Sequence, residues 1–175
     1  MRSERETNRT IERYADTAQR LCIVYLKNHA DAEDVFQTVF FKYCLSPVVF
    51  ESDEHEKTWL IRVTVNTCKD WLKSFFRSRT VSLEEIIELP SEVLQEKRNV
   101  LKAVLSLPAK YCDVVYLHYY EQCTAPQIGE ILRKNVSAVY TLLTRAKERL
   151  RERLGDEAWT IKHRRHLTQF VRAKH

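Results

Sequence analysis

The chain has 175 residues and a net charge of +5, with 29 basic against 24 acidic side chains. This length suits one ordinary domain or two small ones, and its two glycines and four prolines are too few for a sheet with many tight turns. No run of about 18 apolar residues could cross a membrane, and residues 1–14 lack the apolar stretch of a signal peptide. We therefore expect an all-α protein that stays in the cytoplasm without membrane insertion.

Three amphipathic helices are predicted in the first part of the chain. Apolar residues recur at a period near 3.6 over residues 10–27. A second helix should begin at Asp31, which is a good N-cap, and end before Ser46-Pro47. An acid-rich loop at 46–56 then leads to a third helix at about 57–78, with one apolar and one polar, mostly basic face. The residues of this polar face are Arg62, Asn66, Lys69, Lys73 and Arg77.

Residues 79–96 separate the two helical halves of the chain. They carry five glutamates with no basic residue from position 80 onward, and Pro90 interrupts any helix, so we interpret them as a linker. Their acidity is compatible with mimicry of nucleic acid in a basic channel and equally with plain solubility. A helix is expected at 97–106, and Pro108 should open the next one.

Residues 124–154 have the pattern of a helix-turn-helix, a motif that places one helix in the major groove of DNA. Thr124 and Gln127 fit a capping box at the start of the first helix, and Asn135 is the expected N-cap of the second. Gly129 lies within the first helix at a cost of about 1 kcal/mol against alanine, so we interpret it as a point of close approach by the second helix. The second helix would expose Ser137, Tyr140, Thr141, Thr144 and Arg145.

Basic residues are concentrated in two blocks. Residues 133–175 contain 12 basic and 4 acidic side chains, a net of +8, which leaves 17 minus 20, or −3, for the remainder. Residues 57–79 contain six basic side chains and one acid. Two such blocks suggest two contacts with a polyanion, because neutralised phosphates supply most of the non-specific affinity for DNA. The alternative is that both blocks are solvated helix faces.

The cysteines and histidines offer little support for a metal site. The five cysteines are odd in number and include no CxxC pair, so we interpret them as reduced residues of the apolar core. His163 and His166 flank two arginines, but two histidines without a third ligand are weak evidence for zinc. We expect no metal and no cofactor.

Three motifs occur in a fixed order: DAEDVFQTVFFKY at 31–43, KTWLIRVTVNTCKDWLK at 57–73, and LPAKYCDVVYLHYYEQCTAPQIGEIL at 107–132. Together they resemble the extracytoplasmic-function (ECF) sigma factors of bacterial RNA polymerase, over roughly residues 10–154. The resemblance implies two small helical bundles on a flexible linker. Its expected parts are sigma region two at 1–78, the linker at 79–96, sigma region four at 97–155 and a basic tail at 156–175.

The resemblance also implies a role for each surface. One set would dock on the clamp coiled coil of the polymerase largest subunit: Asp31, Asp34, Gln37, Thr38 and Phe41. Loop 46–56 would hold a flipped base of the −10 promoter element, and the −10 strand would lie along Arg62, Asn66, Lys69, Lys73 and Arg77. Trp59 and Trp71 could stack on bases or belong to the core. The −35 element would be read by Tyr140, Thr141, Thr144 and Arg145, with Lys147 on phosphate. This chain has Arg133 where the family commonly has a glycine in the turn.

The implied partners are core RNA polymerase, through its clamp and flap, promoter DNA, and an anti-sigma factor. No catalysis is expected, because the sequence has no HExxH, no GxSxG and no glycine-rich phosphate loop. The Glu54-His55-Glu56 cluster is interpreted as a solvated acidic turn. The alternative function is a stand-alone helix-turn-helix regulator that binds duplex DNA without polymerase.

Overall fold

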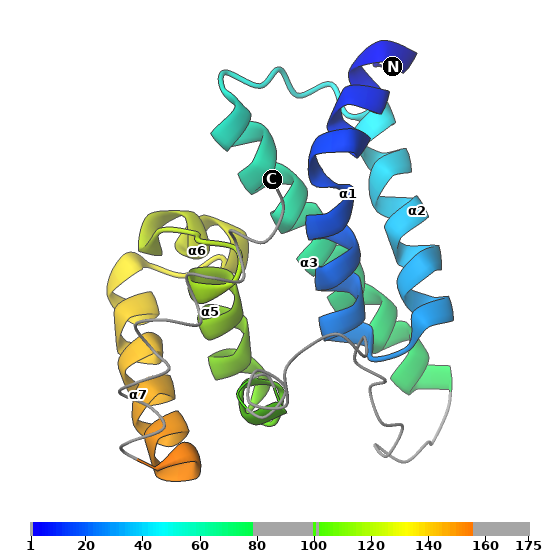
Figure 1. Ribbon diagram of the computed structural model, residues 1–175. Helices are drawn as coiled ribbons and strands as arrows, with labels where there is room; N and C mark the ends of the chain where they lie inside the picture. The colour runs from blue at the N-terminus through cyan, green and yellow to red at the C-terminus, as the bar shows by residue number, and fades with distance from the viewer. Residues whose placement is uncertain (1, 79–99, 101, 156–175) are drawn as a thin grey trace. The chain divides into compact units, whose positions relative to one another are not determined.

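The computed structural model describes residues 2–78, 100 and 102–155, with side chains up to residue 74 in the first range. Every regular element among these residues is a helix (Figure 1), which confirms the predicted all-α class. The chain divides into two compact units, 1–88 and 89–175. The predicted linker at 79–96 and the tail at 156–175 lie outside the described residues.

The first unit contains α1 (Glu4–Leu26), α2 (His29–Leu45) and α3 (Asp53–Ser78), which all pack against one another (Figure 1). Their apolar stripes meet in a shared core, with Leu21, Val35, Val39 and Val65 completely buried. Burying each such side chain contributes about 1.5–3 kcal/mol. Within the described ranges, no helix is both long and apolar enough to cross a membrane.

The first two helices begin earlier than the sequence predicted. The start of α1 is Glu4, not residue 10, because Ser3 and Glu6 form a capping box. The N-cap of α2 is Asn28, whose side chain accepts a hydrogen bond of 3.1 Å from the backbone N–H of Asp31. The prediction of Asp31 as the N-cap was therefore wrong. Its carboxylate instead lies in the first turn of α2, where its negative charge is attracted to the positive end of the helix dipole.

The acid-rich loop is shorter than predicted. Helix α2 ends at Leu45 with Ser46 as its C-cap, as expected, but α3 already begins at Asp53. The loop therefore spans 46–52 and not 46–56. Three of the acids belong to the first turn of α3, where they stabilise the helix N-terminus: Asp53, Glu54 and Glu56.

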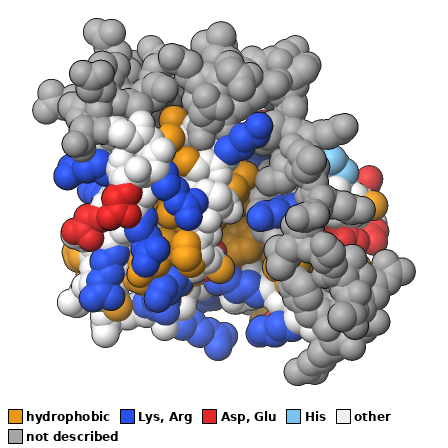
Figure 2. Space-filling view, turned by 90° about the horizontal axis from the view of Figure 1, so that it is seen from below, with side chains coloured by type: hydrophobic (Ala, Val, Ile, Leu, Met, Phe, Trp, Pro, Cys, Tyr) orange, Lys and Arg blue, Asp and Glu red, His pale blue; other side chains and the backbone are white. Residues whose placement is uncertain are grey.

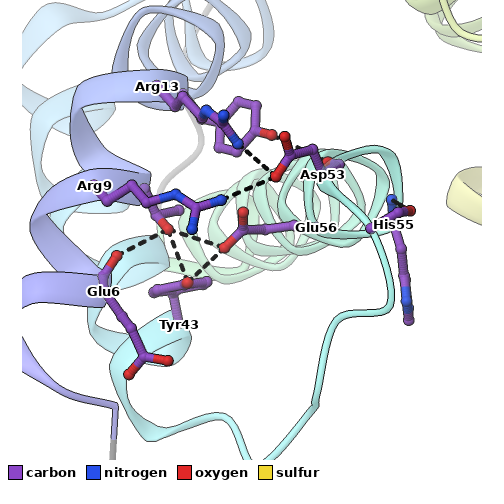
Figure 3. A network of polar contacts seen from close by, with 10 residues as sticks. Glu6, Arg9, Arg13, Tyr43, Asp53, His55 and Glu56 are labelled. Atoms are coloured by element: carbon purple, nitrogen blue, oxygen red, sulfur yellow. Dashed lines mark hydrogen bonds and ion pairs between the residues drawn. The ribbon is translucent and has the colours of Figure 1, made fainter.

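A polar network at the start of α3 joins the three helices of this unit (Figure 3). Glu56 is only 7% exposed, and its Oε1 accepts hydrogen bonds from Tyr43 Oη at 2.6 Å and Thr10 Oγ1 at 2.9 Å. The interpretation of a solvated acidic turn is thus wrong for Glu56, since its carboxyl is buried and bonded. At the surface, the Arg13 guanidinium lies 2.5 Å from Asp53 and lowers the pKa of that carboxyl.

The cysteines are free thiols, and Cys22, Cys68 and Cys123 are buried, in agreement with the predicted packing role. Cys22 of α1 and Cys68 of α3 meet in the core of the first unit. Hydrogen bonding to Cys22 and burial together raise the pKa of the Cys68 thiol. Because the thiolate is the reactive form, the raised pKa makes Cys68 less reactive than an exposed thiol.

The second unit contains α5 (Ala109–Tyr119), α6 (Ala125–Leu132) and α7 (Val136–Leu154), preceded by a helical stretch at 102–105. Pro108 is the N-cap of α5, as predicted. The expected packing residues Val114, Val115 and Leu117 are buried in α5. The apolar stripe of α7 is also confirmed and consists of Val139, Leu143, Ala146 and Leu150.

The helix-turn-helix has the predicted caps. Thr124 and Gln127 form a capping box, and Asn135 Oδ1 accepts a hydrogen bond of 2.7 Å from the N–H of Ala138. Gly129 is confirmed as a point of close approach, since an added Cβ would lie 2.7 Å from the carbonyl oxygen of Lys134. The nearest neighbour is the backbone of the turn at Lys134, and the second helix follows at its first residue, with the Val136 nitrogen 4.0 Å from the added Cβ.

Arg133 ends α6 in the left-handed conformation, with φ 54° and ψ 52°. This region costs an L-residue with a side chain roughly 1 kcal/mol, whereas glycine enters it freely. We predict that Arg133→Gly slows amide hydrogen exchange in α6 by about fivefold, equivalent to about 1 kcal/mol. Arg133→Ala is the matched control, because it removes the charge and keeps the Cβ. Equal exchange in both variants would show that the turn carries no such strain.

Candidate nucleic-acid interface

One face of α7 consists of side chains that the helix does not use for packing. Val139, Leu143 and Ala146 hold the opposite side of α7 in the core. All the predicted groove-facing positions are exposed: Tyr140, Thr141, Thr144, Arg145 and Lys147. Tyr140 is 59% exposed, so most of its ring is open to a partner. The face thus presents hydroxyl, methyl and guanidinium groups of the kinds that read base edges.

Glu148 belongs to this face and was missed by the sequence analysis. It is exposed and lies along the same open surface hollow as Tyr140, Thr144 and Arg145. Its spacing of four residues from Thr144 and three from Arg145 could have placed it there. A carboxylate on a DNA-facing surface can accept a hydrogen bond from cytosine N4 and is repelled by phosphate.

The basic residues nearer the end of α7 contact tyrosines of α5. Lys147 Nζ lies 5.9 Å from the ring centre of Tyr119, and the Arg149 guanidinium lies 5.1 Å from that of Tyr111. Burial by itself would raise the pKa of Tyr111. The positive charges of Lys110 and Arg149 together outweigh burial, so the pKa is lowered. These cations are therefore oriented by the aromatic rings of the same unit.

The polar face of α3 is only partly open. Arg62, Asn66 and Lys69 are half-buried, whereas Lys73 is exposed. Lys69 Nζ lies 5.8 Å from the Tyr25 ring centre, and Lys73 forms an ion pair of 3.2 Å with Asp70. Arg77 lies within α3, but its side chain is outside the described residues. Figure 2 shows Lys and Arg side chains reaching the surface of the described residues.

The two tryptophans of α3 occupy packed positions. Trp59 is 7% exposed and lies edge-on to Tyr43 and Phe50, with ring centres 6.0 and 5.5 Å apart. Trp71 is half-buried and packs against the same core. The structure therefore favours a core role for Trp59 over stacking on bases.

The outer face of α2 combines acidic, polar and apolar groups. Of the predicted docking residues, Asp31 is half-buried. The other four are exposed: Asp34, Gln37, Thr38 and Phe41. Phe41 is 64% exposed, and Leu45, one helical turn further on, is 52% exposed. Leu45 was missed, although its spacing of four residues from Phe41 indicates the same face. Large apolar side chains in a row on a solvent face are typical of a protein-binding surface.

These features define the class of the protein. The second unit is a helix-turn-helix of the DNA-binding type, and the first unit has a basic helix face together with an exposed apolar and acidic helix face. Comparison with known families adds the particular group. Sigma-70 region 2 matches residues 10–79, and sigma-70 region 4 matches residues 97–150.

Characterised relatives cover most of the chain. The ECF RNA polymerase sigma factor SigW of Bacillus subtilis is 27% identical over 163 residues, 83% of this chain and 87% of the relative. The RNA polymerase sigma-E factor of Streptomyces coelicolor is 30% identical over 128 residues, 71% of this chain and 72% of the relative. The chain therefore belongs to the sigma-70 family and is an ECF-type RNA polymerase sigma factor. A stand-alone regulator is not favoured by these matches.

Solved structures of similar fold include the sigma factor RpoE of Bartonella quintana in complex with the anti-sigma factor NepR. It has a TM-score of 0.72 and 19% identity, and the match covers 84% of this chain and 95% of that one. CnrH in complex with the cytosolic domain of CnrY has a TM-score of 0.65 and 18% identity, over 87% of this chain and 89% of that one. At these identities the likeness establishes the fold.

Proposed function

We propose that the chain divides the work of promoter recognition among three helix faces. The single observation that supports this division is that α2, α3 and α7 each keep one polar or mixed face outside the core of its unit. Residues 1–78 would form the part that binds core polymerase and the −10 element. Residues 97–155 would form the part that binds the −35 element and the flap, with 79–96 as linker and 156–175 as a basic tail.

The outer face of α2 is the proposed contact with the clamp coiled coil of the polymerase largest subunit. Phe41 and Leu45 supply exposed apolar area, and Asp34 lies two helical turns before Phe41 on the same side. Interfaces commonly combine an aromatic anchor with charges that fix orientation. In this arrangement Phe41 is the anchor, while Asp31, Asp34, Gln37 and Thr38 set the register.

The polar face of α3 and the loop 46–52 are the proposed −10 site. Arg62, Lys69, Lys73 and Arg77 would follow the strand backbone, and Asn66 would contact a base. Selectivity coupled to extrusion of a base suits a factor that opens DNA, since the energy of unpairing then depends on the sequence. Loop 46–52, beside this helix, would receive the extruded base.

The exposed face of α7 is the proposed −35 site. Tyr140, Thr141 and Thr144 suit contacts with thymine methyl groups, and Arg145 suits guanine. Lys147 would bind phosphate, which positions the helix without reading sequence. The chain would have no catalytic activity of its own and would act in the cytoplasm, where it recruits core polymerase, opens the −10 region and leaves after initiation. An anti-sigma factor is a further proposed partner. RpoE was solved in complex with the anti-sigma factor NepR, and CnrH was solved in complex with the cytosolic domain of CnrY.

The division is tested by footprinting polymerase–promoter complexes over both promoter elements, on a template that is already mismatched at −10. Alanine at Tyr140, Thr141, Thr144 and Arg145 together should abolish hydroxyl-radical protection of the −35 region. Protection of the −10 region should persist, because the first unit still meets its unpaired strand. The control replaces the exposed Glu152 near the end of α7 and should leave protection of both regions intact. Loss of −10 protection together with −35 protection would contradict separate roles for the two units.

A further inference from the structure

Arg2, two residues before the start of α1, is attached to the end of α2 and to the loop that follows it. The backbone N–H of Arg2 donates a hydrogen bond of 2.9 Å to the carbonyl of Cys44, in the last turn of α2. The Arg2 side chain donates a hydrogen bond from Nη2 to the carbonyl of Val48, within the loop 46–52. One residue thus bonds to the backbone on both sides of the point where the chain leaves α2.

The Arg2 guanidinium also covers two aromatic rings. Its Cζ lies 4.5 Å from the ring centre of Tyr43 and 4.6 Å from that of Phe50. These rings are nearly parallel, with centres 6.0 Å apart. Phe50 belongs to the loop, and Tyr43 belongs to α2 and is fixed by its bond to the buried Glu56. A cation over both rings therefore couples the loop to the rigid core of the unit.

Helix α3 also holds the loop, at Phe50. Phe50 packs edge-on to His55 and Trp59 of α3, which holds one side of the loop. Val49, between the two residues that Arg2 contacts, is 84% exposed. The loop is thus held at Val48 and Phe50 and presents the residue between them to the outside.

The position of Arg2 is itself fixed by the fold. Ser3 is the N-cap of α1 and forms a capping box with Glu6, in which Ser3 N–H donates to the Glu6 carboxylate at 3.0 Å. The Ser3 hydroxyl, which donates to the same carboxylate at 2.7 Å, and then the Ser3 N–H lower the pKa of Glu6. The capping box fixes the backbone of Ser3 at the start of α1, and the residue before it lies against the end of α2, where Arg2 N–H bonds to the Cys44 carbonyl.

We propose that Arg2 is a positioning residue that holds the loop 46–52 in one conformation and thereby sets base selectivity in the −10 element. This inference rests on the proposed role of the loop in receiving an extruded base. Arg2 does not contact the base in this account. It acts through Val48 and Phe50, which fix where the exposed tip of the loop lies.

The first test concerns the free protein. Hydrogen exchange of amides in 46–52 should be about tenfold faster in Arg2→Ala, since two cation–ring contacts and a hydrogen bond are lost. The exchange rate in Arg2→Lys should be intermediate. An ammonium group can still donate a hydrogen bond, but it lacks the planar guanidinium that covers two rings. Arg5→Ala is the control, since Arg5 is exposed on the first turn of α1 and carries the same charge. Unchanged exchange in Arg2→Ala would overturn the anchoring.

The second test concerns promoter selection. Transcription is measured with core polymerase on two sets of templates, which carry each of the four bases at each −10 position and at each −35 position. Arg2→Ala should reduce the preference at a single −10 position by about tenfold, the same factor as the loop opening, and leave preferences at −35 unchanged. A uniform loss of transcription on all templates would contradict the selectivity role, because simple destabilisation acts on every promoter alike. No transcript from the unaltered chain would contradict the proposed function itself, which separates the two failures.

Discussion

Asp34→Arg should abolish binding of the chain to core RNA polymerase and leave its fold intact. Asp34 is exposed on α2 and lies on the face that carries Phe41 and Leu45. Reversing a charge in an interface replaces attraction with repulsion and costs several kcal/mol, so the affinity should fall by about 100-fold or more. The measurement is a titration of labelled protein with core enzyme, with circular dichroism to verify the helix content.

The matched control is Glu12→Arg, which makes the same change of charge at an exposed position of α1. Both variants shift the net charge by two units, so a non-specific electrostatic effect would weaken binding equally in each. Asp34→Arg alone should lose affinity. Affinity within threefold of the unaltered chain would remove the outer face of α2 from the polymerase interface.

Gly129→Val should disrupt the helix-turn-helix. Even an alanine Cβ would lie 2.7 Å from the carbonyl oxygen of Lys134, and the same turn is closed by a backbone hydrogen bond of 2.8 Å from Lys134 N–H to the Gly129 carbonyl. A branched side chain must therefore push the turn away from α6. Overpacking of this kind costs about 1–3 kcal/mol and should displace the groove-facing side of α7.

The expected readouts are a lower urea midpoint for the second unit and loss of the −35 footprint with polymerase. Glu152→Val is the control, because it adds the same side chain at an exposed position of α7. The urea midpoint of Gly129→Ala should lie between those of Gly129→Val and Glu152→Val, since the higher helix propensity of alanine stabilises α6 by about 1 kcal/mol. A Gly129→Val protein with unaltered stability and footprint would show that the turn yields freely.

The helices and their inner faces could be predicted from periodicity, because burial of an apolar stripe imposes a 3.6-residue repeat on the sequence. The caps were predicted where the signature was considered, as at Thr124 and Asn135. They were wrong at Asp31 because Asn28 is an equally good capping residue and local sequence does not rank the two. The Ser3–Glu6 capping box was a readable signal that the prediction of a start at residue 10 overlooked.

The site residues were predictable only as helix faces. Tyr140, Thr144 and Arg145 follow from the stripe of α7, because whatever is not buried on a helix of this kind must face outward. Contacts between distant segments were not predictable, since periodicity carries no information on them. The burial of Glu56 between Tyr43 and Thr10 and the contact of Arg2 with Val48 arise only when three helices are brought together.

Run-off transcription with core polymerase and the purified chain, on DNA taken from upstream of its own operon, shows directly whether the chain works as a sigma factor. We expect a discrete transcript that requires the chain, whose start point defines one −10 and one −35 element. A gel shift of the same DNA by the chain alone, without any transcript when polymerase is added, would instead indicate a regulator that binds duplex DNA independently.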